Sequence, residues 1–126
     1  MSRKKEDAVV SPNEAEAHMI VKAMRIYLGL TQPEVAKKVG ISASTYSSYE
    51  NAPGELLKAR FCVVYKILEV VHLNPKKFMQ GKYVLDDLGR QITTLHTGRI
   101  SHILLKMIRN NCPVTLKEEG DENGRQ

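Results

Sequence analysis

The sequence predicts an all-α fold, and three observations lead to this prediction. Valine, isoleucine and leucine recur at steps of three and four residues more often than in alternation, which is the period of an amphipathic helix. Capping residues and glycines divide the chain into short helical segments. Because 126 residues, of which 42% are hydrophobic, can bury one core but not two, we expect one compact domain with a small extension.

The first helix should begin after Ser11 and end near Leu28. In SPNE, a serine cap is followed by a proline at the first helical position and by Glu14 three residues after the cap, which together form a capping box. Gly29 then ends the helix. Its buried stripe contains four apolar residues: Ile20, Val21, Met24 and Leu28.

Two short helices are predicted next, on either side of Gly40. The box TQPE at 31–34 opens the first, and the second begins at Ser42 and continues to about Glu50. Because Ala36 is small and glycine tolerates positive φ, the two helices can cross closely around the turn. Four bulkier side chains should face inward and hold the pair to the other helices: Val35, Ile41, Tyr46 and Tyr49.

The outer face of the second short helix has an unusual composition. Residues 42–48 contain four serines and one threonine, but no lysine, arginine or glutamine. The residues left facing outward are small and uncharged: Ala43, Ser44, Ser47 and Ser48. A flat, neutral helix face of this kind can enter the major groove of B-form DNA. The alternative is that the serines are simply tolerated on a solvated face.

After a break at residues 51–54 (NAPG), a fourth helix and a final short turn complete the predicted domain. The buried stripe of the fourth helix is expected to contain Phe61, Val64, Tyr65, Leu68 and Val71. The motif NPKKF at 74–78 adds a cap, a proline and a short helical turn. Five helices therefore occupy residues 13–82.

A second apolar stripe runs through residues 83–111 and predicts two amphipathic stretches, or one helix kinked at Gly98. Its apolar residues are Leu85, Leu88, Ile92, Leu95, Ile100, Ile103, Leu104, Met107 and Ile108. The stripe either packs on the first five helices or pairs with its copy in a homodimer. Dimerisation is the preferred interpretation, because five helices already complete a core. The polar, acidic residues 112–126 are expected to be disordered.

Basic residues are concentrated in the first two thirds of the chain. The net charge is +5, and residues 1–82 hold 13 lysines and arginines against 8 acidic residues, whereas residues 83–126 hold 6 of each kind. This asymmetry is typical of a domain that binds a polyanion, although a modest excess also serves solubility. Residues 1–12 form a flexible basic arm that either follows DNA or remains a solubilising tail.

Several functional classes are disfavoured by what the sequence lacks. The four histidines show no metal spacing with Cys62 or Cys112, and there is no HExxH motif, P-loop or nucleophile elbow. We therefore expect no enzymatic activity, no metal and no cofactor. The polar N-terminus lacks the apolar core of a secretory signal, and no apolar run has the length of a membrane span, so a cytoplasmic protein is expected.

The joint spacing of these motifs resembles the Xre family, the Cro/cI type of helix-turn-helix regulators. The matching segments are Arg25, GLTQ at 29–32, EVAKKVGIS at 34–42, YEN at 49–51, the helix from Phe61 to Val71, and LNPKKF at 73–78. The resemblance covers about residues 13–80. It implies the five-helix, lambda-repressor-like DNA-binding fold, here with a C-terminal helical extension, and double-stranded DNA as the partner. It also implies a bacterial or phage origin.

The resemblance further implies roles for individual residues. Gln32 and Asn51 would contact phosphates, while Arg25 and Glu50 correspond to a pair that usually forms a buried ion pair between the first and third helices. The residues that match groove-facing positions are Ala43, Ser44 and Ser48. At the edge of the groove, Ser47 or Thr45 would reach a base or a phosphate.

The sequence departs from the better known repressors in two respects. Glutamine, lysine and arginine are absent from the groove positions, so no bidentate contact to guanine or adenine can form there. Specificity must then come from short hydroxyls, water, a thymine methyl against Ala43, and DNA shape. The link between Asn51 and Phe61 is also longer, and keeps only Lys58 and Arg60 as candidates for additional phosphate contacts.

The predicted function is therefore sequence-specific binding of duplex DNA near a promoter by a homodimer, which most simply represses transcription. One alternative is an antitoxin-type autorepressor whose C-terminal helices, within residues 85–108, hold a toxin partner. A third interpretation, in which the C-terminal part senses a ligand or peptide, ranks last because nothing in residues 83–126 resembles a pocket.

Overall fold

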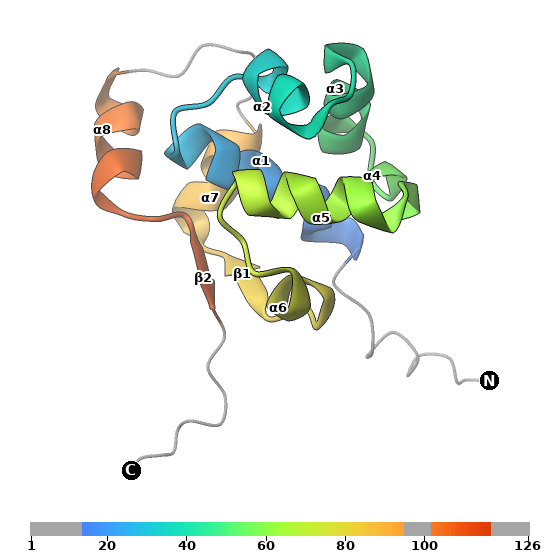
Figure 1. Cartoon of the computed structure of the whole chain (residues 1–126). Helices are drawn as coiled ribbons and strands as arrows, with labels where there is room; N and C mark the ends of the chain where they lie inside the picture. The colour runs from blue at the N-terminus through green and yellow to red at the C-terminus, as the bar shows by residue number, and fades with distance from the viewer. Residues whose placement is uncertain (1–13, 95–101, 117–126) are drawn as a thin grey trace, which may run out of the picture.

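The computed structural model describes residues 14–94 and 102–116 and shows a helical protein with one small antiparallel sheet (Figure 1). The elements are α1 (Glu14–Tyr27), α2 (Gln32–Val39), α3 (Ala43–Asn51), α4 (Glu55–Lys58), α5 (Phe61–Val70), α6 (Pro75–Met79), β1 (Tyr83–Leu85), α7 (Asp87–Thr94), α8 (His102–Asn110) and β2 (Val114–Leu116). The predicted all-α class is confirmed. None of the helices described is long and apolar enough to cross a membrane.

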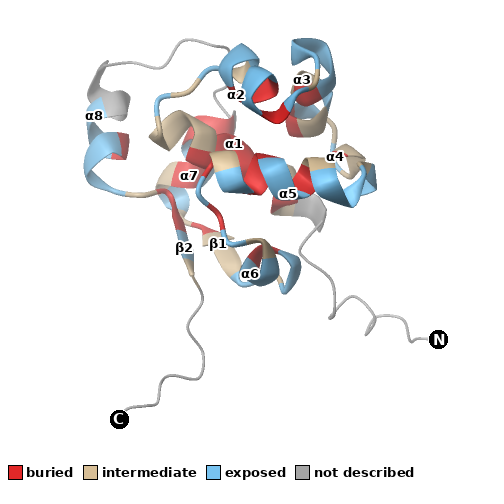
Figure 2. Cartoon of the chain, in the orientation of Figure 1, coloured by how far each residue is buried: buried red, intermediate tan, exposed pale blue. Residues whose placement is uncertain are grey.

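Helix α1 is the central element of the core. It contacts α3 and α4 as well as α7, β1 and β2, and its buried residues lie at the centre of the molecule (Figure 2). Five of its apolar side chains are at most 7% exposed: Ala17, Ile20, Val21, Ala23 and Met24. Because the helix is covered from more than one direction, its buried surface is wider than the single stripe that the sequence indicated.

The ends of α2 and α3 follow the predicted caps. In α2, the Glu34 amide donates to Thr31 Oγ1 at 3.2 Å and the Thr31 amide donates to the Glu34 carboxylate at 2.7 Å, which completes the capping box. These bonds hold the pKa of Glu34 below its usual value, the Thr31 backbone amide contributing most. Gly40 ends α2 at φ 94°, and Ser42 caps α3 by accepting from the Thr45 amide. The cap predicted at Ser11 lies outside the described residues.

Two parts of the predicted domain differ from the structure. A short helix, α4, lies in the segment expected to be an irregular link, and its Leu56 is 1% exposed. In α5, Phe61 and Tyr65 are not part of the core, because they are 67% and 41% exposed. The buried side of α5 is instead formed by Val64, Ile67 and Leu68. Apolar residues of α5 do recur at helical spacing, as predicted. The prediction was wrong in including Phe61 and Tyr65 in the buried face.

The C-terminal stripe packs within the same chain. Strand β1 pairs antiparallel with β2, with Leu85 opposite Val114, and α7 packs on α1. Leu85, Ile92 and Ile108 are at most 1% exposed. The alternative that the sequence analysis did not prefer, packing within the monomer, is therefore what covers these residues. A homodimer built on residues 83–111 has correspondingly less apolar surface available.

The first part of the expected disordered tail is ordered. Val114 is buried in β2, and Cys112 Sγ lies 3.7 Å from Met24 Sδ of α1. The prediction of disorder over residues 112–126 is therefore wrong for residues 112–116, because two apolar residues there reach the core. The kink expected at Gly98 and the arm at residues 1–12 lie outside the described residues.

Gly89 of α7 provides a test of this C-terminal packing. A Cβ there would lie 2.6 Å from Leu85 Cδ2 and 2.8 Å from the Pro113 carbonyl oxygen. Replacing glycine by alanine inside a helix normally stabilises it by about 1 kcal/mol, but overpacking against fixed backbone costs about 1 to 3 kcal/mol. Gly89→Ala should therefore lower the free energy of unfolding, measured by urea denaturation.

The control is Gln91→Ala, at an exposed position of the same helix. It should change the free energy of unfolding by less than about 0.5 kcal/mol. A Gly89→Ala protein as stable as the wild type would show that α7 does not approach Pro113 so closely.

Candidate nucleic-acid interface

The candidate interface is built on the crossing of α2 and α3, which lie side by side (Figure 1). Ala36 of α2 is 2% exposed, and Val35 and Tyr46 are fully buried. Ile41 and Tyr49 are half-buried and pack against the core. The four bulkier side chains expected to face inward are therefore buried or half-buried, and the opposite side of α3 is left to solvent.

The outer face of α3 is uncharged and carries hydroxyl groups. Its exposed residues are Ala43, Ser44, Thr45 and Ser48, whereas Ser47 is half-buried. Figure 2 shows this face as largely exposed. The hydroxyl of Ser42 donates to Thr45 Oγ1 at 2.8 Å, and that of Ser48 donates to the Ser44 carbonyl at 3.2 Å. These local bonds leave oxygen lone pairs free to accept from a base edge or from water.

The carboxylate of Glu50 anchors the end of α3. Its side chain is fully buried, and Arg25 of α1 donates to it from Nε at 2.6 Å and from Nη2 at 3.0 Å. Gln32 at the start of α2 donates to the same carboxylate at 2.9 Å. One carboxylate therefore joins α1, α2 and α3, and the ion pair expected for Arg25 and Glu50 is present.

The sequence analysis expected the Gln32 side chain to be available for a DNA phosphate, but in the structure this side chain already has a partner. One N–H of its amide is used by Glu50, so the side chain is held in a fixed position. The second N–H remains available, because a primary amide has two donors. Asn51, also proposed for a phosphate, is the last residue of α3 rather than the residue after it, and it donates to Ser47 Oγ at 3.0 Å.

Further titratable groups lie close to Glu50. Among them, the sequence analysis expected Tyr46 to face inward but missed Lys22. Lys22 of α1 is 7% exposed. Burial lowers its pKa, while the charge of Glu50 opposes this shift. Burial also raises the pKa of Tyr46, and the negative charge of Glu50 adds to the effect. The spacing of three residues between Lys22 and Arg25 places both on one face of α1, which is a signal that could have identified Lys22.

The two basic candidates of the longer link are exposed and lie beyond α3. Lys58 ends α4, and its Nζ lies 3.4 Å from the Glu55 carboxylate in a pair open to solvent. Arg60 precedes the first residue of α5. Helix α4, which ends at Lys58, packs against α3. We call Glu50, Arg25 and Gln32 the Glu50 cluster. Among the described residues, no interaction joins Lys58 or Arg60 to this cluster.

The described ranges, 14–94 and 102–116, contain no group of three or more histidine, cysteine, aspartate or glutamate side chains placed to hold a metal ion. The surface around α3 carries neutral hydroxyls, amides held by hydrogen bonds and flanking cations. Such groups bind polar edges and phosphates.

Comparison with known proteins identifies one family. A family model described as a helix-turn-helix domain matches residues 20–84, from α1 to β1. All of the candidate DNA-contact residues lie inside the matched region, together with Arg25 and Glu50. No curated protein and no solved structure matches the chain.

The Glu50 cluster can be tested by mutation. Glu50→Ala would leave Arg25 and Lys22 without their buried counter-charge, and breaking a buried pair in this way costs about 3 to 5 kcal/mol. The free energy of unfolding from urea denaturation should fall by that amount. The matched control is Glu55→Ala, which removes one partner of the exposed pair with Lys58 and should cost less than about 1 kcal/mol. Equal losses in the two variants would contradict the anchoring role of Glu50.

Proposed function

The chain belongs to the helix-turn-helix domain family, and from this premise we propose that it is a sequence-specific regulator of transcription that binds double-stranded DNA. We further propose that it acts as a homodimer and most simply as a repressor. The observation that carries the proposal is the exposed, uncharged face of α3, whose opposite side is fixed to α1 and α2 through Glu50.

In the proposed complex, α3 lies in the major groove. Ala43 contacts a thymine methyl, and the Ser44 and Ser48 hydroxyls contact base edges directly or through water. The similarity of the motifs to the Xre or Cro/cI type supports this choice of helix. Because these side chains are short, the helix backbone can approach the base pairs closely. The remaining specificity comes from the shape and deformability of the site.

Phosphates on both sides of the groove are contacted by polar and basic groups around α3. Gln32 uses its second amide N–H, and Thr45 and Asn51 use side-chain donors at opposite ends of the helix. Lys58 and Arg60 add positive charge from the neighbouring link. Two copies bind half-sites about one helical turn apart, and the occupied promoter is then closed to polymerase.

The alternative, an antitoxin-type autorepressor, would need a toxin-binding surface on the C-terminal extension. Met107 of α8 is 47% exposed and is the feature that favours such a surface. Co-expression with the product of the neighbouring gene distinguishes the two functions, because an antitoxin would purify as a stable heteromeric complex.

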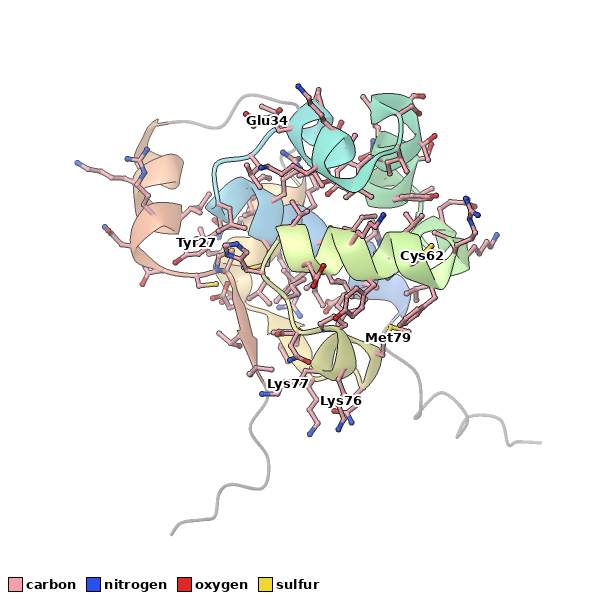
Figure 3. The ribbon with its side chains drawn as sticks, in the orientation of Figure 1. Tyr27, Glu34, Cys62, Lys76, Lys77 and Met79 are labelled. Atoms are coloured by element: carbon pink, nitrogen blue, oxygen red, sulfur yellow. The ribbon has the colours of Figure 1, made fainter. Side chains whose placement is uncertain are left out.

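Lys58→Ala and Arg60→Ala test the phosphate contacts. Each variant should weaken binding to specific and random duplexes alike and lower the slope of log affinity against log salt by about 0.9. Fluorescence anisotropy at several salt concentrations measures both quantities. The matched control is Lys77→Ala, because Lys77 is exposed on α6 at the end of the molecule away from α3 (Figures 1 and 3). An equal change of slope in the control would reject the assignment.

Ser44→Ala and Ser48→Ala test the groove contacts. Losing a hydroxyl that bonds a base should cost about 1 kcal/mol on the preferred site, roughly fivefold in affinity, and leave binding to random duplex unchanged. The preferred site comes from selection of bound duplexes from a random pool. If the serine variants lost the same affinity on every sequence, α3 would not be the helix that contacts bases.

A further inference from the structure

Three exposed lysines gather at one corner of the molecule, around α6. Lys76 and Lys77 are the second and third residues of this helix, and Figure 3 shows both side chains pointing away from the protein. The Lys82 amide donates to the Lys77 carbonyl at 3.0 Å, which places Lys82, also exposed, beside the end of the helix. We call these three residues the lysine corner.

The lysine corner has no carboxylate partner within residues 14–94 and 102–116. The ion pairs found there join α1 to α3, lie within α4, and join α7 to α1, so none of them includes a lysine of this corner. Three like charges on neighbouring residues repel one another, and a polyanion bound beside them would relieve that repulsion.

The described part of the chain ends next to the lysine corner. Leu116, the last residue of β2, pairs with Tyr83, which directly follows Lys82 in the sequence. The Tyr83 hydroxyl accepts from the amide of Asn74, the N-cap of α6, at 2.8 Å. Because an extended chain spans about 3.3 to 3.6 Å per residue, the residues after Leu116 can reach the lysine corner within a few positions.

The residues that follow Leu116 are rich in carboxylates. Residues 117–126 (KEEGDENGRQ), which we call the acidic segment, hold four acidic residues against two basic ones. All four carboxylates lie within residues 118–122, immediately after the strand. Charges of opposite sign are therefore available on the two sides of the point at which the chain leaves the sheet.

We propose that the acidic segment docks on the lysine corner of its own chain and keeps other polyanions away from it. If the pairing of β1 with β2 continued, Lys117 would stand opposite Lys82, where like charges are unfavourable. The acidic segment therefore leaves the ladder after Leu116 and turns its carboxylates towards α6. Because the two parts belong to one chain, their effective concentration is of millimolar order, and weak individual ion pairs suffice.

Cleavage of the acidic segment by a glutamate-specific protease tests whether it is held. Such cleavage follows the population of the undocked form when docking is fast. Replacing the three lysines of the corner by glutamine should therefore speed cleavage at low ionic strength by about threefold or more, as expected from the loss of several exposed ion pairs. This corner variant carries Lys76→Gln, Lys77→Gln and Lys82→Gln.

The matched control removes the same charge from exposed positions of α2 and α5. It carries Lys37→Gln, Lys38→Gln and Lys66→Gln, and its acidic segment should be cleaved at the wild-type rate. Equal acceleration in the two triple variants overturns the inference, because the protease would then respond only to net charge.

Zero-length crosslinking of carboxylates to amines locates the contact. A carbodiimide should join the acidic segment to the lysine corner and rarely to Lys37 or Lys38, since α2 lies at the other end of the molecule from α6 (Figure 1). In about 1 M salt, where the Debye length is about 3 Å, these crosslinks should become rare. Crosslinks spread evenly over the exposed lysines, or insensitive to salt, overturn the inference.

Binding of a random-sequence duplex tests whether docking keeps polyanions from the corner. The carboxylates are neutralised by Glu118→Gln, Glu119→Gln, Asp121→Asn and Glu122→Gln. This change should strengthen binding of the otherwise wild-type chain by about fivefold more than it strengthens binding of the corner variant, because the two sets of charges are coupled. Equal gains in both backgrounds would be a long-range charge effect and overturn the inference. The proposed function is judged separately, by the serine variants on the preferred site.

Discussion

The geometry of the candidate interface depends on the carboxylate of Glu50. It is the point at which α1, α2 and α3 are joined, through donors on Arg25 and Gln32. Burying a charge is unfavourable unless it is paired and hydrogen-bonded. Here the donors satisfy the carboxylate, and the fixed geometry of the guanidinium determines the position of the end of α3 relative to α1. Apolar packing alone would leave the rotation of so short a helix less well defined.

What could be predicted from the sequence was mostly local. The box at Thr31 and Glu34, the stop at Gly40 and the cap at Ser42 are decided within one helical turn, and each was found where the sequence placed it. The pair of Arg25 and Glu50 could be identified only through the family resemblance. Neither residue has a local pattern that indicates its partner.

What could not be predicted depends on contacts between distant parts of the chain. Leu85 pairs with Val114, but the sequence around either residue does not indicate its partner. The second segment is also too short to show the alternation of apolar and polar residues that predicts a strand. The prediction that Phe61 is buried was wrong for a related reason. Helical spacing defines a stripe, but the edge of the buried face depends on which helices cover it, and nothing in residues 61–71 specifies that.

In the complex with DNA that we propose, the short side chains of α3 make the Glu50 anchor more important than it would be for a helix with long base-contacting side chains. An arginine or glutamine at a groove position can adjust several torsions to reach a base when its helix is slightly misplaced. A serine has one side-chain torsion that moves its oxygen, and alanine has none. For the proposed contacts to form, the backbone of α3 must therefore be placed accurately before DNA binds, because its short side chains cannot correct an error. A rigid connection to α1 and α2 achieves this placement, and it also reduces the entropy lost on binding.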